Sequence, residues 1–243
     1  MKVPTKSKQV PGLEEEMALL SQGFSFIAGV DEAGRGSLAG PVVAAAVILP
    51  LGVLSPFDFD PHECLECFAG VRDSKQLPSK ERERLFETIM HHALAVGVGI
   101  GSVEMIDERN ILQATKYAMH DAIGQLTPSP QALLLDAIHL SDMILLQRSI
   151  IKGDTLCLSI AAASIIAKVT RDRIMVQLHE RFPAYGFAQH KGYGTEDHLN
   201  ALREHGATPH HRRSFAPVRE LFGLFQEEDL NSSRRAIKSK KLG

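Results

Sequence analysis

The residues best suited to chemistry are two adjacent carboxylates, Asp31 and Glu32, which follow an apolar run at residues 26–30. A glycine-rich loop that carries one cation, Arg35, comes directly after them. Carboxylates can bind a hard divalent cation, because such ions prefer oxygen ligands. The loop glycines leave the backbone open to a ligand, and an arginine can bond to phosphate. This stretch therefore predicts a metal site beside a place where the backbone of a polyanion approaches.

Two further acids occur in similar positions. Asp136 ends the apolar run 131–135, and Asp154 follows Gly153, which permits a tight approach. Acids that lie close together raise one another's pKa unless a cation is bound, so a shared metal site is one interpretation. The other is that Asp154 caps a helix and Asp136 forms a turn at a strand end. The candidate metal ligands are Asp31, Glu32, Asp136 and Asp154.

Several basic and aromatic residues are candidates for contact with a polyanion. The loop at Gly34, Arg35 and Gly36 is not a Walker loop, because no Gly-Lys-Ser/Thr follows it. Tyr193 lies in a polar loop, where its ring could stack on a sugar or base or could be an ordinary half-buried side chain. The basic cluster 210–213 could meet phosphates or lie on the surface.

Two other groups have a weaker signal. His62, Cys64 and Cys67 resemble half of a zinc site, but the chain has no second Cys-x-x-Cys pair, so free thiols are expected. On the stretch 160–182, Ser164, Lys168 and Arg171 form a polar stripe at helical spacing, which we interpret as a surface stripe.

The elements that must position these residues alternate between strand and helix patterns. Apolar runs predict strands, and 3.6-residue periodicity predicts helices. A strand at 96–101 should present a face made only of glycine, against which a helix can pack closely. The expected strands are 26–30, 42–49, 96–101, 131–135 and 143–151, and the expected helices are 13–22, 79–93, 111–123, 160–182, 195–205 and 218–225.

This order indicates an α/β fold with a mixed central sheet flanked by helices and a helical C-terminal part. We expect residues 1–24 to be a leader with a short helix, and 25–225 to form one domain with the C-terminal helices. The stretch 50–69, rich in proline and aspartate, should be a surface excursion. The polar, basic residues 226–243 should be a disordered tail.

Composition limits the class of protein. Of 243 residues, 44% are hydrophobic and 23% are charged, which is typical of a soluble globular protein. The N-terminus lacks the apolar core of a signal peptide, so a cytoplasmic protein without a membrane span is expected. Three cysteines argue against a disulfide framework. A net charge of −2 neither indicates nor excludes a nucleic-acid partner.

Taken together, the motifs resemble those of the ribonuclease HII family, the type 2 ribonucleases H. The resemblance extends over about residues 27–219. The segment GSLAGPVVAAAV is more similar to the bacterial branch of the family than to the archaeal or eukaryotic ones. The related ribonuclease HIII group is disfavoured because it lacks the Gly-Arg-Gly loop. The matching segments, in family order, are GVDEAGRGSLAGPVVAAAVIL, DSKQL, LLLDAIHL, KGD, AAASIIAKVTRDRIM and HKGYGT.

The resemblance implies a ribonuclease H-like fold and an endoribonuclease. It implies cleavage of the RNA strand of RNA–DNA hybrids, and cleavage 5′ of single ribonucleotides in duplex DNA, by two Mg²⁺ or Mn²⁺ ions. The products would carry 3′-hydroxyl and 5′-phosphate ends. The implied metal ligands are Asp31, Glu32, Asp136 and Asp154, and the implied nucleic-acid-binding residues are Gly34, Arg35, Gly36, Ser74, Lys75 and Tyr193.

Three departures from the family pattern stand out. Ala137 follows Asp136 where the family usually has glycine, the excursion 51–69 is longer than expected, and the tail after Phe225 matches nothing assignable. Alternatives are a catalytically inactive hybrid-binding protein and a nuclease of the same fold that cuts branched DNA. A monomer is expected. Residues 221–225 should pack on the core, with docking on a sliding clamp as the alternative.

Overall fold

The computed structural model describes residues 10–51 and 60–221. Within these ranges the chain forms two compact units. The first unit contains residues up to Ala33, Val42–Gly101 and Thr115–Arg171, and the second contains Gly34–Pro41, Ser102–Ala114 and the residues from Asp172 onward. The expected tail 226–243 and residues 222–225 lie outside the described residues, as do residues 1–9 and 52–59.

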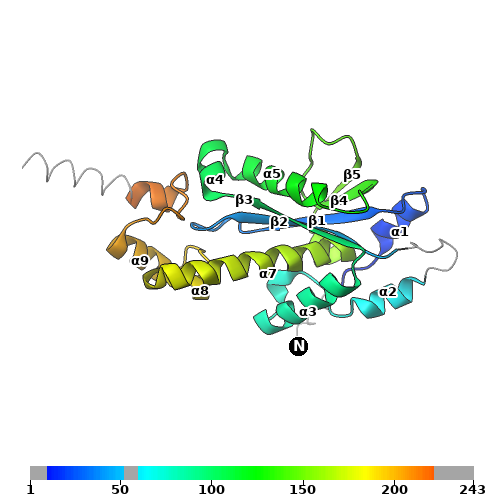
Figure 1. The fold of residues 1–243 in the computed structure, drawn as a ribbon, viewed down its shortest axis with the longest axis horizontal. Coiled ribbons are helices and arrows are strands. Elements are labelled where there is room, and N and C mark those ends of the chain that lie inside the picture. Colours follow the sequence, from blue (N-terminus) through cyan, green and yellow to red (C-terminus); the bar gives the residue numbers. More distant parts are fainter. Residues whose placement is uncertain (1–9, 52–59, 222–243) are drawn as a thin grey trace, which may run out of the picture. The chain divides into compact units, whose positions relative to one another are not determined.

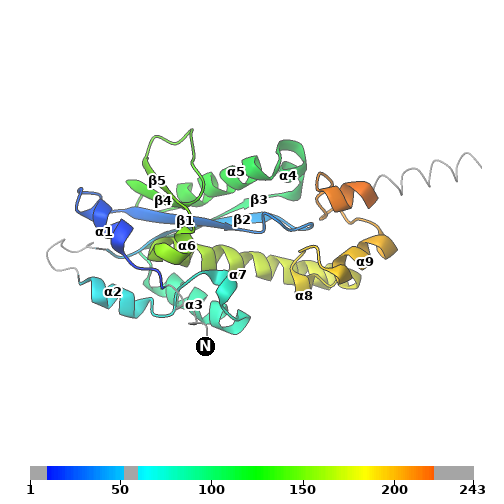
Figure 2. The ribbon, with the colours of Figure 1, turned by 180° about the vertical axis from the view of Figure 1, so that it is seen from behind.

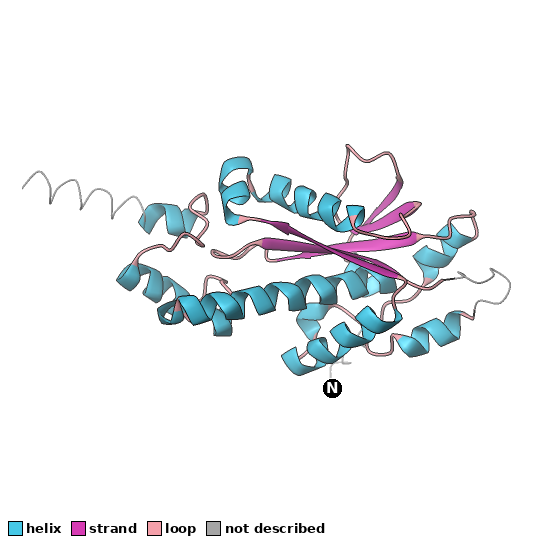
Figure 3. Ribbon diagram, in the orientation of Figure 1, coloured by secondary structure: helices cyan, strands magenta, loops and turns pink. Residues whose placement is uncertain are grey.

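The first unit is built on a five-stranded sheet with the order β3-β2-β1-β4-β5. The strand β1 pairs antiparallel with β2 and parallel with β4, so the sheet is mixed, as predicted (Figure 3). The pairs β2–β3 and β4–β5 are antiparallel and parallel, respectively. The strands are β1 (Ile27–Ala33), β2 (Val42–Ile48), β3 (Ala95–Gly101), β4 (Ala132–Asp136) and β5 (Leu146–Ile150).

The strand that carries Asp31 and Glu32 extends further than the expected 26–30. Both residues lie inside β1, where Asp31 pairs with Ala45 and Glu32 with Ala44. The apolar pattern ends at Val30, but pairing with the fully buried β2 extends the strand to Ala33. The acids are therefore held by the central strand of the sheet and not by a loop.

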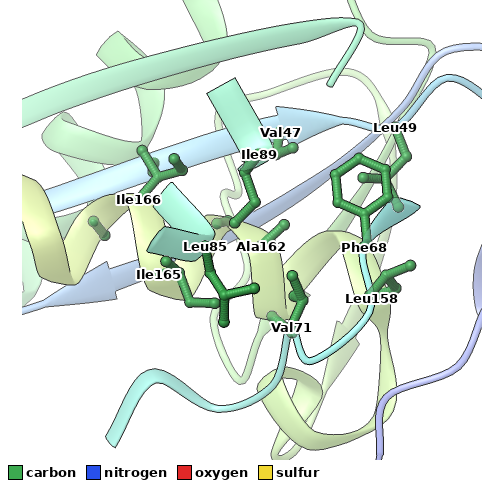
Figure 4. Packing of buried hydrophobic residues seen from close by; sticks show 14 of the residues in the cluster. Val47, Leu49, Phe68, Val71, Leu85, Ile89, Leu158, Ala162, Ile165 and Ile166 are labelled. Atoms are coloured by element: carbon green, nitrogen blue, oxygen red, sulfur yellow. The ribbon is translucent and has the colours of Figure 1, made fainter. Parts of the chain in front are cut away.

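Helices cover both faces of this sheet (Figure 1). On one face α5 (Ile111–Gly124) packs its apolar side on β1, β2 and β4. On the other face the first part of α7 (Leu158–Arg181) packs with α3 (Ser79–His92) in a second apolar cluster. Figure 4 shows this cluster, in which Leu85 and Ile89 of α3 meet Ile165 and Ile166 of α7.

The glycine face of β3 was predicted correctly. A Cβ atom added at Gly97 or Gly99 would lie 2.0 Å from the carbonyl oxygen of Ala122 or Ala118, respectively. Both alanines belong to α5, so the bare face of β3 lets this helix pack directly on the strand backbone. This close contact fixes the position of α5 on the sheet.

Three short helices complete the first unit. They are α1 (Glu14–Leu20), α2 (Pro61–Cys67) and α6 (Gly153–Leu156), and a 3₁₀ turn, η1, spans Ser74–Gln76. Figure 2 shows α6 against the sheet, directly before α7. The helix α2 was not predicted. It lies in the proline-rich excursion and begins behind the capping carboxylate of Asp60. It buries Cys64 in the core, and its C-cap residue Phe68 is buried in the same cluster.

The second unit is mainly helical. Its core gathers apolar side chains from the end of α7, the loop at Leu38 and Ala39, and the segments that follow. Its elements are α4 (Val103–Arg109), η2 (Pro183–Tyr185), α8 (Phe187–His190), α9 (Glu196–His205) and a helix that begins at residue 216. The helix α4 was not predicted, whereas the start of α9 behind Thr195 was.

Among the described residues, no helix is both long and apolar enough to span a membrane.

Candidate active site

The structure brings three of the four predicted acids together. Carboxylate oxygens of Asp31, Asp136 and Asp154 all lie within 4.8 Å of one another. Glu32 is not part of this group of three, although its charge acts on Asp31. The role of Glu32 as a fourth metal ligand therefore stays a prediction.

Sheet pairing explains how distant acids meet. The strands β1 and β4 run parallel, and Val30 pairs with Leu135, which places Asp31 and Asp136 at the same level of neighbouring strands. The backbone N–H of Gly153 donates a hydrogen bond to Asp136 Oδ1 at 2.9 Å. This bond ties the first residue of α6 to the end of β4, and Asp154 is the next residue of α6. The structure therefore places Asp154 inside a short helix and not at its cap.

The departure at Ala137 leaves Asp136 in place. Ala137 has a φ of 52°, in the left-handed region that glycine adopts more easily. Its backbone N–H still donates to the carbonyl of Ile150 at 3.1 Å, which continues the pairing of β4 with β5. Asp136 thus keeps its position at the end of the strand.

The acid cluster has the electrostatics of a cation site. Asp31 is 2% exposed, and its Oδ2 atom has no hydrogen-bond partner among the residues that the structure describes. Burial raises the pKa of Asp31 well above its ordinary value, and the charges of Glu32 and Asp136 raise it further. Burial also raises the pKa of Asp154, with the charge of Asp73 as the next cause. An oxygen-preferring divalent cation would relieve this repulsion, so the residues fit such a metal.

A serine pair lies behind Asp31. The Oγ atoms of Ser74 and Ser164 are 2.9 Å apart, both residues are buried, and a hydrogen bond from Ser164 to Asp31 lowers the pKa of that carboxyl. The interpretation of Ser164 and Arg171 as part of a surface stripe was wrong, because both are buried. Ser74 is thus linked to Asp31 through Ser164.

Lys75 also lies at the acid cluster. Its Nζ atom is 3.5 Å from Asp154 Oδ2, while its side chain stays 71% exposed. Burial lowers the pKa of Lys75, but the charges of Asp31, Asp154 and Asp73 outweigh burial and raise it. Arg82 holds this turn, because its Nη1 donates to the carbonyl oxygens of Ser74 and Leu77 at 3.1 and 2.6 Å.

In the second unit, the Gly-Arg-Gly loop is held by Arg212. The guanidinium donates to the backbone oxygens of Gly34 at 2.7 Å, Arg35 at 2.9 Å and Gly40 at 3.0 Å. Arg212 is fully buried, whereas the Arg35 side chain and Gly36 are exposed. The loop therefore presents its outer surface while its carbonyl groups are fixed from behind.

Tyr193 lies in the same unit, with its side chain 38% exposed. The loop before it contacts the Gly-Arg-Gly segment, since Leu38 donates its N–H to the carbonyl of Gly192 at 2.8 Å. Gly192 has a φ of 81°, and a Cβ there would lie 2.5 Å from the carbonyl oxygen of Ala39. The contact between the two loops thus requires glycine at this position.

Sequence reasoning missed the roles of His211 and Arg212. Both belong to the basic cluster 210–213, but both are buried and hydrogen-bonded, whereas Arg213 is exposed. Nothing in the local pattern separates Arg212 from Arg213. The distinction depends on bonds to carbonyl groups more than 170 residues earlier in the chain.

The half zinc motif gains no support from the described residues. Cys64 is buried in the apolar core, and burial raises the pKa of its thiol to about 12. Cys67 is exposed, and neither cysteine joins His62 in a group of three metal ligands within the ranges that the structure describes. This fits the expectation of free thiols.

Comparisons of the sequence with known proteins identify the family of this chain. The sequence model of the family described as Ribonuclease HII matches residues 28–218. Curated ribonuclease HII proteins of Bacillus cereus strain Q1 and Bacillus thuringiensis strain Al Hakam are each 51% identical to the chain over 216 residues. In both cases the match covers 89% of this chain and 79% of the relative.

Solved structures give the same result. Ribonuclease H2 from Pyrococcus horikoshii OT3 matches with a TM-score of 0.67 and 27% identity, over 83% of this chain and 99% of that chain. A complex of PCNA with ribonuclease HII from Archaeoglobus fulgidus matches with a TM-score of 0.63 and 28% identity, over 80% of this chain and 96% of that chain. The fold is ribonuclease H-like, as expected, and the chain belongs to the ribonuclease HII family of metal-dependent endoribonucleases.

Proposed function

We propose that this protein cleaves the RNA strand of RNA–DNA hybrids and cuts 5′ of single ribonucleotides embedded in duplex DNA. The products carry 3′-hydroxyl and 5′-phosphate ends. The observation that carries this proposal is the cluster of Asp31, Asp136 and Asp154, whose carboxylate oxygens lie within 4.8 Å of one another around a buried, unpartnered oxygen of Asp31.

Asp31, Asp136 and Asp154, together with Glu32, are the residues that hold the metal. Two Mg²⁺ or Mn²⁺ ions, when bound there, supply an activated water and neutralise charge on the phosphate and the leaving oxygen. The hydrogen bond from the N–H of Gly153 to Asp136 positions Asp136 and the adjacent Asp154 before any ion binds. Ordering these two side chains when the ions bind therefore costs little free energy. Ser164 holds the Asp31 carboxylate.

Substrate recognition falls to the second unit and to the turn at Ser74. Gly34, Arg35 and Gly36 read the 2′-hydroxyl, the group that distinguishes RNA from DNA. Tyr193 packs on the neighbouring sugar, which its exposed ring permits. Lys75 is an exposed cation beside the acids and contacts the nucleic-acid backbone, while the buried Ser74 positions Ser164.

A cleavage assay tests this function. The substrate is end-labelled duplex DNA with one ribonucleotide, incubated with Mg²⁺ or Mn²⁺, and compared with an all-DNA duplex and a branched DNA. We expect one metal-dependent cut, 5′ of the ribonucleotide. The Asp136→Asn variant should lose at least a hundredfold in rate, because it removes one charge from the metal site.

The controls separate the alternatives. Asp121 is an exposed acid of α5 outside the site, so Asp121→Asn should cut like the unmodified protein. Binding without any cleavage would point to an inactive hybrid-binding protein. Cleavage of the branched DNA alone would point to a different nuclease of this fold, and full activity of Asp136→Asn would reject the proposed metal site.

A sliding clamp is a second proposed partner. The related archaeal ribonuclease HII was solved in a complex with PCNA. In this chain, Leu221 packs against the apolar core of the second unit, and Phe225 lies outside the described residues. A pull-down with a bacterial clamp checks the idea: capture that Phe225→Ala abolishes supports it, and equal capture of both proteins assigns no role to Phe225.

We also propose that the protein is a cytoplasmic monomer. The curated relatives that it resembles are bacterial ribonuclease HII proteins, which agrees with that location. The mass in solution, measured by light scattering, tests the monomer. A mass near 53 kDa, about twice the 26.6 kDa of the chain, would indicate a dimer instead.

A further inference from the structure

Behind Tyr193 lies a continuous chain of buried hydrogen bonds. His198 Nδ1 is 2.9 Å from the backbone oxygen of Tyr193, and His198 Nε2 is 3.0 Å from His211 Nε2. At the other end, His211 Nδ1 accepts from the backbone N–H of Thr208 at 2.9 Å and lies 2.8 Å from Thr208 Oγ1. The two histidines are 0% and 1% exposed, so water does not replace any of these bonds.

The ends of this chain assign the tautomers of both rings. The backbone N–H of Thr208 can only donate, so His211 Nδ1 accepts and His211 Nε2 carries the proton. His211 Nε2–H therefore donates to His198 Nε2, which leaves the proton of His198 on Nδ1. That proton is donated to the carbonyl of Tyr193, which can only accept. Thr208 Oγ1 accepts the backbone N–H of His210 at 3.2 Å, so its own proton can be donated to His211 Nδ1. With neutral rings, this arrangement satisfies every group.

An additional proton is disfavoured in this chain. A proton on His211 Nδ1 would face the N–H of Thr208 and would require the Thr208 hydroxyl to turn its own proton away, and a proton on His198 Nε2 would face the N–H of His211. In agreement, burial lowers the pKa of His198 to about 4, and burial with the neighbouring His198 lowers the pKa of His211 to about 3. The pair also has no lone pair left over for a metal ion.

A third histidine holds the other side of the loop. The N–H of Gly192 donates to His190 Nδ1 at 3.1 Å, and His190 Nε2 donates to the carbonyl of Tyr185 at 2.6 Å. The rings of His190 and His198 are stacked with their centroids 4.4 Å apart. The backbone N–H of Tyr193 donates to the carbonyl of His190 at 3.0 Å. Both backbone groups of Tyr193 are therefore fixed by this cluster.

The start of α9 places His198 correctly. Thr195 caps the helix, and its Oγ1 accepts a hydrogen bond from the backbone N–H of His198 at 3.3 Å. His198 thus lies in the first helical turn, where the helix dipole disfavours a positive ring. Thr195 also donates its own N–H to the carbonyl of Tyr193 at 2.8 Å, so the cap and the histidine hold the same oxygen.

We propose that His198 and His211 are positioning residues for Tyr193: as a neutral pair with fixed tautomers, they orient its ring for the sugar next to the ribonucleotide. This inference rests on the proposed role of Tyr193 in recognition. A pair that served stability alone would support cleavage of all substrates equally. A pair that acts through Tyr193 affects the substrates that need Tyr193.

The test compares two substrates, a duplex with a single ribonucleotide and a continuous RNA–DNA hybrid. His198→Leu removes both ring bonds, and should lower kcat/KM on the single-ribonucleotide duplex roughly ten- to a hundredfold, with a much smaller loss on the hybrid. His198→Asn keeps an N–H near the position of Nδ1 and should recover most of the loss. His205→Leu, an exposed histidine of the same helix, should leave both values unchanged.

A double-mutant cycle shows whether His198 acts through Tyr193. In a Tyr193→Ala background, His198→Leu should add no further loss on the single-ribonucleotide duplex. Additive losses, or equal losses on the two substrates, would overturn the inference. Failure of the unmodified protein to cut at the ribonucleotide would reject the proposed function itself, and the inference with it.

A spectroscopic measurement does not depend on the folding of any variant. In protein labelled with ¹⁵N-histidine, the ring nitrogen shifts report which nitrogen carries the proton. We expect the Nδ1–H form for His198 and the Nε2–H form for His211, with no protonation between pH 8 and pH 5. The opposite tautomers, or a protonated ring at pH 6, would refute the hydrogen-bond chain.

Discussion

The backbone N–H of Gly153 donates a hydrogen bond to the Oδ1 atom of Asp136, with 2.9 Å between the two atoms. This bond joins the end of β4 to the first residue of α6, and so brings Asp154 beside Asp136. The contact is tight, because a Cβ atom at position 153 would lie 2.6 Å from Ile160 Cδ1 and 3.6 Å from Asp136 Oδ1. Gly153 therefore sets the spacing of two of the acids.

Gly153→Ala should separate these acids. The added methyl group would lie 2.6 Å from Ile160 Cδ1, and Ile160 is fully buried, so the Ile160 side chain must leave its place or α6 must shift away from β4. We expect a tenfold or larger loss of cleavage, because small displacements of a catalytic group are costly, and a loss of about 1–3 kcal/mol in the free energy of unfolding. Cleavage rates and urea denaturation at pH 7.5 measure both effects.

Gly124→Ala is the matched control for this change. A Cβ atom at Gly124, the last residue of α5, would meet nothing within 4 Å. This variant should keep full activity and equal or exceed the stability of the unmodified protein. If Gly153→Ala behaved in the same way, Gly153 would not set the spacing of the acids.

Asp31→Asn should abolish cleavage and raise the stability of the metal-free protein. The buried carboxyl of Asp31 has a raised pKa, first because of burial and then because of Glu32 and Asp136, so its charge destabilises the metal-free fold. Removing that charge should raise the free energy of unfolding in EDTA by about 1–2 kcal/mol, while cleavage falls to background. Thermal unfolding with and without Mg²⁺ measures the effect.

The change in Tm on adding Mg²⁺ is a second test of this prediction. Added Mg²⁺ should raise the Tm of the unmodified protein, since ligands stabilise the state that binds them, and should raise that of Asp31→Asn much less. The exposed Asp121→Asn should follow the unmodified protein throughout. A metal-free Asp31→Asn that is less stable than the unmodified protein would contradict the electrostatic argument.

The identity of the strands was predictable from local pattern, but their ends were not. Apolar runs identify β1 and β2, and the alternating glycines of β3 predict its close contact with a helix. The end of β1 at Ala33 depends on pairing with β2, which local polarity at Asp31 conceals. The helix α2 was missed for a similar reason, because its burial in the core outweighs the proline-rich surroundings.

The acids were predictable as candidates, whereas their meeting was not. Position after an apolar run selects Asp31 and Asp136, but their proximity follows from the parallel pairing of β1 with β4, about 100 residues apart. The burial of polar residues is harder still to predict from the sequence. Arg212 and His211 look like a surface cluster in the sequence, and only long-range partners reveal that they are fully paired inside the fold.

The neutral histidine pair should also leave a signature in the pH dependence of stability. The pKa values of His198 and His211, about 4 and about 3, lie below the ordinary value of 6.5 that applies when the chain is unfolded. Below pH 6.5 the unfolded chain binds protons that the native pair does not, so stability falls as the pH decreases toward 4. Between pH 7 and pH 5.5 the pair should account for a loss of about 2 kcal/mol.

A His198→Leu, His211→Leu variant isolates this contribution. Groups such as Asp31, whose raised pKa acts in the opposite direction, are present in both proteins and cancel in the comparison. The variant should be less stable at pH 7.5, because the N–H of Thr208 loses its acceptor, but its stability should change less between pH 7 and pH 5.5. Parallel curves for the two proteins would show that the pair takes up protons in the native state.

Arg212 and Arg213 provide a direct test of how the Gly-Arg-Gly loop is held. Arg212 is buried and donates to three backbone oxygens of that loop, and Arg213 is its exposed neighbour. Arg212→Lys keeps the charge but loses the planar fork, so it should leave carbonyl groups of Gly34, Arg35 or Gly40 without donors. We expect a loss of about 2–4 kcal/mol in stability and a tenfold or larger fall in cleavage at a single ribonucleotide.

Arg213→Lys preserves the same charge on the same segment and should change neither quantity. The comparison separates the role of the fork from that of the positive charge, because both variants keep the net charge of −2. If the main role of this cluster were to bind the phosphates of the duplex, both substitutions would have small and similar effects on cleavage. Both variants would then also keep the salt dependence of the unmodified protein. A large effect of Arg212→Lys alone means that Arg212 acts by fixing the loop that reads the ribonucleotide.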